Sequence, residues 1–220
     1  MRDLLVTGTD TGVGKTVIAV ALVTALRRRG VRAIGFKPVE TGLTPGQSSD
    51  SELLARASDE SHPLAAPLLQ LPEALAPAVA ADRAGVALDP DQIESRIAQL
   101  RAAGYTVVVE GAGGVMVPLA WNYSVLDLAQ ACDLDAVVVG RAGLGTLNHV
   151  AMTVMMLRSR EIAIRGVVLN GRGTTPDLAE ETNPVALGRM LYGLRIIELP
   201  RRPVEHDVAA LAAAGVERLL

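Results

Sequence analysis

The chain has 220 residues, a formal net charge of −3 and one cysteine. This length predicts a single domain, 1–220, with a substantial buried core. The mildly acidic balance argues against nucleic acid as a partner, and a single cysteine excludes an internal disulfide. The start is too polar for a signal peptide, and the longest apolar run, 17–26, has half of the roughly 20 residues that a membrane helix needs. We therefore expect a soluble, cytoplasmic protein that does not contact a membrane.

Short β-branched runs alternate with longer helical patterns along the chain. A first strand, 4–7, precedes a helix that begins at Lys15 and stops at Gly30. Further helices are expected over 89–104 and from 146 to 160. Further strands are expected over 33–36, 105–109, 136–139, 166–169 and 195–199. This alternation predicts an α/β fold of the P-loop NTPase type, with a mostly parallel central sheet and helices on both faces.

The stretch GTDTGVGKT, residues 8–16, joins the first strand to the first helix and matches a phosphate-binding loop. Backbone N–H groups at a helix start, with glycines that let the chain wrap closely, suit phosphate oxygens. Lys15 is expected to reach the β- and γ-phosphates, and the Thr16 hydroxyl to bind Mg²⁺. The general pattern has its first glycine where this chain has Thr9, with Gly8 one place earlier. This displacement points to a particular branch of the P-loop proteins.

Three charged residues are expected near this loop. Glu110 stands where the predicted strand 105–109 stops, and should bind Mg²⁺ unless it is only a solvated loop charge. Asp50 could supply another oxygen ligand or only cap a helix. Lys37 follows the second strand at the same edge of the sheet as the phosphate loop. A second cation there favours phosphoryl transfer, and the alternative is a lysine that extends into solvent.

The segment 62–90 interrupts the alternation with closely spaced prolines at positions 63, 67, 72, 77 and 90. This spacing excludes a long regular helix. An insertion of this length in an α/β domain is expected to cover or shape a site, and the alternative is a loosely ordered surface excursion.

Four motifs on the predicted strand ends, GTDTGVGKT, KPVETG, VEGAGG and GLGTLNH, together resemble those of the dethiobiotin synthetases. Further likeness in VVLN near 170 and IIELP near 200 extends the resemblance over nearly the whole chain. The family's loop, G-T-D-T-x-V-G-K-T, has the same displaced glycine. The resemblance implies an ATP-dependent enzyme of biotin synthesis. It would convert 7,8-diaminononanoate, CO₂ and MgATP to dethiobiotin, ADP and phosphate, through a carbamate and a carbamic-phosphoric anhydride.

The resemblance also implies roles for residues at matching positions. Lys15 and Lys37 would be the catalytic cations, and Thr16, Asp50 and Glu110 the Mg²⁺ ligands. The substrate would contact Thr11, which would also meet phosphate, and Thr41, Thr146, Leu147 and Asn148. ATP would contact the phosphate loop and three strand ends: Gly12, Val13, Gly14, Lys15, Thr16, Val17, Asp50, Glu110, Gly111, Ala112, Gly113, Asn170, Gly171, Leu199, Pro200 and Arg201.

Two of these roles are more specific. The amide of Asn170 would pair with the adenine edge. The stretch 143–149 would open a helix whose N–H groups bind the substrate carboxylate in the neighbouring subunit of a homodimer. Ordinary helix capping by Thr146 is the alternative for that stretch.

The chain departs from the family pattern at Gly12, where many members have glutamate, and in 177–188, where a substrate-contacting tyrosine has no match. The alternative function is a partition-type P-loop ATPase switch that makes no metabolite. Its extra lysine near the loop start is absent from positions 8–14. A cobyrinic-acid amidase would need a glutamine-hydrolysing domain for which this length leaves no room. A GTPase would need an N-K-x-D motif, which the sequence lacks.

Overall fold

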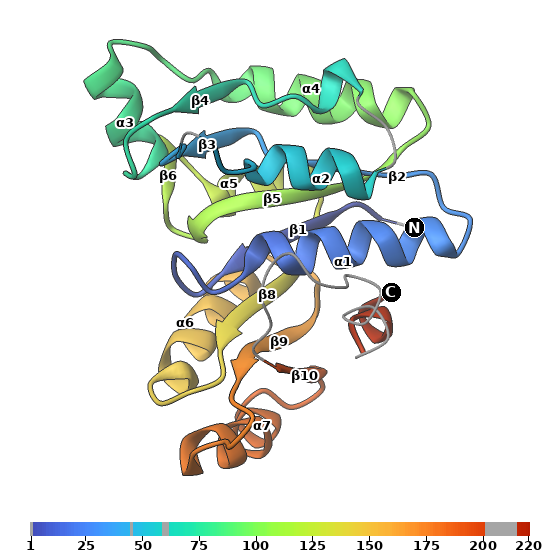
Figure 1. Cartoon of the computed structure of the whole chain (residues 1–220), viewed down its shortest axis with the longest axis vertical. Helices are drawn as coiled ribbons and strands as arrows, with labels where there is room; N and C mark the ends of the chain where they lie inside the picture. The colour runs from blue at the N-terminus through green and yellow to red at the C-terminus, as the bar shows by residue number, and fades with distance from the viewer. Residues whose placement is uncertain (1, 45, 59–61, 201–214) are drawn as a thin grey trace.

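The computed structural model describes residues 2–44, 46–58, 62–200 and 215–220 (Figure 1). Within these ranges a central sheet of six strands has the order β10-β9-β8-β1-β5-β2, and all of its neighbouring strands are parallel. Its strands are β1 (Leu4–Gly8), β2 (Ala33–Phe36), β5 (Thr106–Gly114), β8 (Asp135–Arg141), β9 (Ile164–Arg172) and β10 (Ile196–Pro200). The predicted α/β class with a parallel sheet is confirmed.

Helices cover both faces of the sheet, apart from one, Pro77–Ala84, that packs against two smaller sheets. They are α1 (Lys15–Arg28), α2 (Asp50–Ala57), α3 (Pro77–Ala84), α4 (Pro90–Ala102), α5 (Val125–Ala131), α6 (Thr146–Ser159) and α7 (Leu178–Met190), with short 3₁₀ turns η1 (Pro63–Ala65) and η2 (Val216–Leu219). Four short strands form two small additional sheets: β3 (Val39–Thr41) with β4 (Leu69–Leu71), and β6 (Pro118–Ala120) with β7 (Tyr123–Ser124). No helix in the described ranges is long and apolar enough to cross a bilayer.

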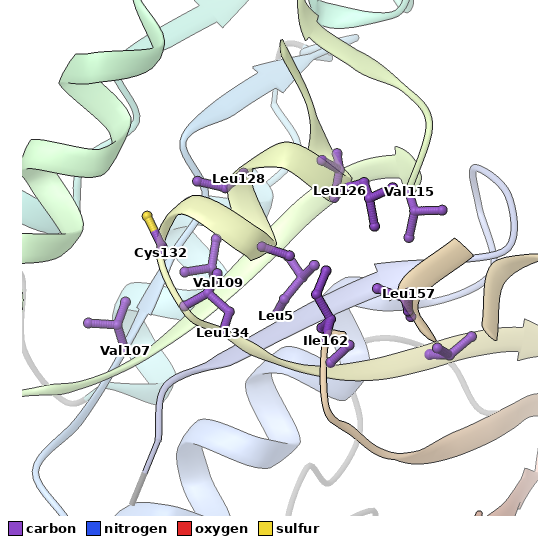
Figure 2. Close-up of a cluster of buried hydrophobic side chains, with 14 of the residues drawn as sticks. Leu5, Val107, Val109, Val115, Leu126, Leu128, Cys132, Leu134, Leu157 and Ile162 are labelled. Atoms are coloured by element: carbon purple, nitrogen blue, oxygen red, sulfur yellow. The ribbon is translucent and has the colours of Figure 1, made fainter. Parts of the chain in front are cut away.

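Two apolar clusters fill the space between the sheet and its helices. Successive strand residues point to opposite faces, so Leu5 and Val109 join a cluster with α4, α5 and α6, whereas Leu4 and Val108 join a cluster with α1. Figure 2 shows part of the first cluster, where the side chains of β1 and β5 meet those of α5. Continuous β-branched strands buried on both faces therefore account for a core with almost no aromatic residues.

Helix α1 begins directly after the phosphate loop and ends close to the predicted stop. It has neither proline nor glycine in its interior, and Arg27 and Arg28 lie in its last turn, where cations favour the helix dipole. The chain then turns at Gly30, whose φ of 77° is a left-handed conformation that glycine adopts without strain. The basic end and the glycine thus define where the helix stops.

The structure corrects three local expectations. Strand β5 continues through Gly114, so Glu110 lies within the strand and pairs with Val6 instead of following the strand. Strand β9 also continues, which places Asn170 beside Leu199 of β10. Backbone pairing to the neighbouring strand extends both ladders past the apolar residues. Helix α2 is capped by a Ser49–Glu52 capping box, so the capping role considered for Asp50 is wrong.

The segment 62–90 folds into short elements. The prolines break it into η1, β4 and α3, and Pro77 occupies the first turn of α3, where its missing N–H costs nothing. Strand β4 pairs in parallel with β3, with Thr41 opposite Leu71. This small sheet attaches the segment to the chain that follows β2, close to the carboxyl ends of the central strands (Figure 1).

Candidate active site at the phosphate loop

The phosphate loop lies between β1 and α1, and its glycines are required by geometry. A Cβ atom at Gly8 would lie 2.6 Å from the carbonyl oxygen of Asp10, closer than real Cβ contacts allow. Gly14 has a φ of 97°, a left-handed conformation that strains other residues. The glycine one place before the general pattern is therefore a requirement of this turn, because a side chain at position 8 would clash with the backbone of Asp10.

Four charged or hydroxyl side chains meet behind the loop. The Lys37 ammonium donates to Glu110 Oε1 at 2.9 Å and also contacts the carboxylate of Asp50. The Thr16 hydroxyl donates to the same Glu110 oxygen at 2.9 Å. Glu110 is 1% exposed and Lys37 is 8% exposed, so the alternatives of a solvated loop carboxylate and a solvent-extended lysine are wrong. The chain after β2, the middle of β5 and the starts of α1 and α2 thus bring together four residues that are far apart in sequence and were predicted to act together.

Burial and neighbouring charge set the ionisation of this cluster. Burial raises the pKa of the Glu110 carboxyl, and the Lys37 ammonium opposes that rise. Burial alone would lower the pKa of Lys37, but Glu110 and Asp50 outweigh it, so the pKa is raised and Lys37 keeps its charge. Burial lowers the pKa of Lys15, whose Nζ donates to the Asp10 carbonyl at 3.1 Å. Lys15 and Lys37 are the only two lysines in the sequence, and both line the same cavity.

This cavity has a volume of about 680 Å³ and lies between the phosphate loop and the segment that follows β4. Its polar wall comes from the loop, from the ends of β2 and β5 and from the start of α2. Its other wall is largely apolar, with Val39, Leu75 and Val117 among its residues. The full lining is Thr11, Gly12, Gly14, Lys15, Thr16, Val17, Lys37, Val39, Thr41, Asp50, Ala74, Leu75, Ala76, Pro77, Glu110, Ala112, Gly113 and Val117.

The residues expected to bind Mg²⁺ fit such an ion in their chemistry. Glu110 Oε2 is buried and has no hydrogen-bond partner in the described part of the chain, so a carboxylate oxygen is available beside Thr16 and Asp50. Carboxylate and hydroxyl oxygens are ligands that Mg²⁺ prefers. The described ranges contain no cluster of three or more His, Cys, Asp or Glu side chains that could hold a metal by themselves. Phosphate or water oxygens would have to complete the coordination shell.

The expected substrate residues fall into two groups. Thr11 and Thr41 line the cavity. Thr146, Leu147 and Asn148 lie at the start of α6 and are not among its lining residues. Thr146 does not cap this helix, because Gly145 is the N-cap residue. Its side chain is 4% exposed, and a Cβ atom at Gly140 would lie 3.2 Å from its hydroxyl oxygen. The Thr146 hydroxyl is therefore buried, and it has no hydrogen-bond partner within the described ranges.

Most residues expected near the nucleotide base lie at the ends of β9 and β10. Leu199 is fully buried in the core, so its side chain is not available to a ligand. Asn170 donates its side-chain amide to the Val13 carbonyl of the phosphate loop at 2.9 Å. Gly111 faces Val125 of the core and not the cavity. Arg201, also assigned to this region, lies outside the described residues.

Sequence reasoning missed two parts of the site. The apolar wall from Ala74 to Pro77 was not assigned, and only the proline spacing of 62–90 indicated that this segment shapes a site. A second cavity of about 340 Å³ at the ends of β9 and β10 was also missed; its lining is Arg172, Gly173, Thr174, Pro176, Glu198 and Pro200. Arg172 of β9 and Glu198 of β10 form an ion pair there at 2.9 Å. No sequence motif contains both residues, so this contact could not be predicted.

Comparison with known proteins identifies the family of the chain. A family model described as an AAA domain matches residues 2–209. The ATP-dependent dethiobiotin synthetase BioD of Anaeromyxobacter dehalogenans strain 2CP-1 is 45% identical over 213 residues, which cover 96% of this chain and 94% of that protein. The chain belongs to the ATP-dependent dethiobiotin synthetase family.

A second relative supports the same family. The ATP-dependent dethiobiotin synthetase BioD of Mycobacterium tuberculosis strain H37Ra is 37% identical over 221 residues, with 99% of this chain and 96% of that protein covered. Among solved structures, a ParA family ATPase from Chlorobium tepidum TLS has a TM-score of 0.58 at 13% identity, and the match covers 100% of this chain and 99% of that one. At this identity the likeness shows a shared fold alone, whereas the synthetase family is shown by sequence.

Proposed function

We propose that this synthetase domain, 1–220, closes the ureido ring of dethiobiotin from 7,8-diaminononanoate, CO₂ and ATP. One amine of the diamine adds to CO₂ and loses a proton, which gives a carbamate. A carbamate oxygen attacks the γ-phosphorus while ADP leaves, and the mixed carbamic-phosphoric anhydride forms. The second amine then attacks the carbonyl carbon and phosphate leaves as the ring closes. The presence of both lysines of the chain in one cavity supports this proposal most directly.

The difficult step brings the carbamate and the γ-phosphate, two anions, into contact. Lys15 and Lys37 are proposed to neutralise this charge from two sides, because preorganised cations in a buried site act more strongly than in water. The backbone from Gly12 to Val17, together with Ala112 and Gly113, is proposed to hold the phosphates. Mg²⁺ bound at Thr16, Asp50 and Glu110 would draw negative charge from the triphosphate.

The diamine is proposed to lie between the polar and apolar walls of the cavity. The hydroxyls of Thr11 and Thr41 are available to its amines, and Val39, Leu75 and Val117 offer an apolar surface to its methylene chain. The base of ATP is proposed to reach the region of Gly171 and Pro200 beside the second cavity, and Arg201 is proposed as a further base contact. This arrangement would leave the triphosphate where the carbamate can attack it.

We further propose a homodimer in which α6 of one subunit completes the site of the other through Thr146, Leu147 and Asn148. Helices α6 and α7 pack together and present apolar side chains to the surface. Leu144 before α6 is 93% exposed, and Met155 on α6 is 66% exposed, which is a large apolar area for a surface without a partner. A cytoplasmic location, where ATP is available, completes the proposal.

Phosphate release tests the activity. The purified chain with bicarbonate, Mg²⁺ and ATP should release phosphate only when diaminononanoate is added, and dethiobiotin should form in equal amount. Phosphate release that does not depend on the diamine would overturn the proposal and favour a nucleotide switch. Lys37→Met should lower kcat by about 10²-fold or more while ATP affinity changes much less. Lys37→Arg keeps the charge but not the shape, and serves as the matched variant.

Sedimentation tests the homodimer. Met155→Glu should convert the chain to monomers and should lower activity as subunits separate, because the start of α6 would no longer reach the neighbouring site. A monomeric wild-type chain with full activity would contradict shared sites.

A further inference from the structure

Asn170 of β9 lies in direct contact with the phosphate loop. Its side-chain Nδ2 donates to the main-chain carbonyl oxygen of Val13 at 2.9 Å. A carbonyl can face only the donor end of a carboxamide, so this contact fixes which end of the Asn170 side chain meets the loop. A Cβ atom at Gly14 would lie 2.0 Å from the same Nδ2. The amide therefore occupies the space that a side chain at position 14 would need.

The backbone of Asn170 is held on both sides. It pairs with Arg141 of β8 and with Leu199 of β10 in parallel ladders. Its carbonyl oxygen accepts a hydrogen bond from the Ala142 N–H at 3.1 Å. Because hydrogen bonds to two neighbouring strands fix the backbone of Asn170, its side chain can restrain the position of the phosphate loop.

We propose that Asn170 is a positioning residue that sets the phosphate loop for the triphosphate. In a trans peptide the C=O and the following N–H point to opposite sides, and the structure has no cis peptide in its described residues. Holding the Val13 carbonyl therefore turns the Gly14 N–H away from Asn170. Val13 is 3% exposed and packs in the core, so core packing holds its side chain while the amide of Asn170 holds its carbonyl.

This inference rests on the proposed ATP site, and it differs from an amide that reads the adenine edge. An adenine-reading amide contributes only when a base is present. An amide that sets the loop contributes equally to any ligand that carries the phosphates. A base-free triphosphate separates the two roles, because inorganic tripolyphosphate has the phosphate chain of ATP and nothing else.

Titration calorimetry with ATP and with tripolyphosphate, at one Mg²⁺ concentration and without diamine, tests the proposal. Asn170→Ala should weaken both ligands by the same factor, roughly threefold to tenfold, the range for one lost hydrogen bond. Asn170→Asp has the same shape but no donor toward the Val13 carbonyl and adds a negative charge near the phosphates, so it should weaken both by more than tenfold. Asn122→Ala, at an exposed asparagine of the β6–β7 turn, is the matched control and should change neither.

The affinities of the Asn170 variants for ATP and for tripolyphosphate distinguish a loop-positioning amide from a base-reading one. A variant that binds ATP more weakly but tripolyphosphate as well as the wild type would show that the amide reads the base, and would overturn the proposal. Unchanged affinity for both ligands would overturn it as well. Because Asn170→Asp keeps the size of the side chain, it guards against an alanine variant that fails to fold. A wild-type chain that binds neither ligand would instead reject the ATP site itself, so the two failures are distinguishable.

Discussion

The ion pair between Lys37 and Glu110 predicts a large and specific loss of stability when its cation is removed. Their charged atoms are 2.9 Å apart, and the side chains are 10% and 1% exposed. At an effective dielectric constant of about 20 such a contact is worth roughly 6 kcal/mol of attraction, most of which offsets the cost of burying the charges. Lys37→Met leaves the carboxylate buried without its cation, so we expect a loss of about 3–5 kcal/mol in the free energy of unfolding.

Urea unfolding without ligands measures this loss, and Lys37→Met with Glu110→Gln is the matched double variant. The double variant removes both charges and should recover most of the loss, with a coupling energy of about 1–3 kcal/mol. A cost for Lys37→Met below about 1 kcal/mol, the value of a solvent-exposed pair, would show that Lys37 does not compensate a buried charge on Glu110.

The same pair gives the loss a pH dependence. Burial raises the pKa of Glu110 and Lys37 opposes the rise, so removing Lys37 raises the folded-state pKa further above the unfolded value. A carboxyl with a raised folded-state pKa favours the folded chain while it is protonated, and this contribution is lost as the pH rises through that pKa. Lys37→Met should therefore lose additional stability, relative to wild type, as the pH increases. A deficit that shrinks with increasing pH would contradict this assignment.

Three further predictions concern residues outside the catalytic cluster. Glu40→Ala should lower the free energy of unfolding by about 1–3 kcal/mol, because Ser51 and Gln70 donate hydrogen bonds to this buried carboxylate and would lose their acceptor. A cost near zero in urea unfolding would show that water replaces the carboxylate. Phe36→Ala should cost about 3–5 kcal/mol in the same assay, since the only phenylalanine is fully buried and leaves a cavity; a smaller loss would mean that the core collapses into the space. Burial raises the pKa of the Cys132 thiol to about 11. A thiol reagent at neutral pH should therefore modify Cys132 only after unfolding, and rapid labelling of the native chain would refute its burial.

The sequence predicts the central sheet well because five of its six strands have continuous buried stretches, and only β10 alternates between buried and more exposed residues. Ala33–Phe36 has the predicted bounds, and the helix at Thr146 begins where it is expected. The short strands β3, β4, β6 and β7 escape prediction because two or three residues carry too little periodicity. Their pairing depends on partners up to about 30 residues away, which a local pattern does not encode.

The candidate site divides in the same way. Lys37, Asp50 and Glu110 could be predicted to meet because ligand residues gather at the carboxyl edge of a parallel sheet. The contact of Asn170 with the phosphate loop could not be predicted, because a strand residue and a loop residue separated by 157 positions approach only in the folded chain. Thr146 matches the expected motif, but its hydroxyl is buried in the core, which the sequence pattern does not indicate.

Because both lysines line one cavity, labels placed on lysine side chains would report on that cavity alone. All other basic side chains are arginine or histidine. Apart from the amino terminus, Lys15 and Lys37 are therefore the only amines that an acylating or alkylating reagent can modify. Isotope-labelled methyl groups introduced by reductive methylation would therefore report on Lys15 and Lys37 with almost no background. Their resonances would follow nucleotide, metal and substrate as each is added, without a mutation in the site.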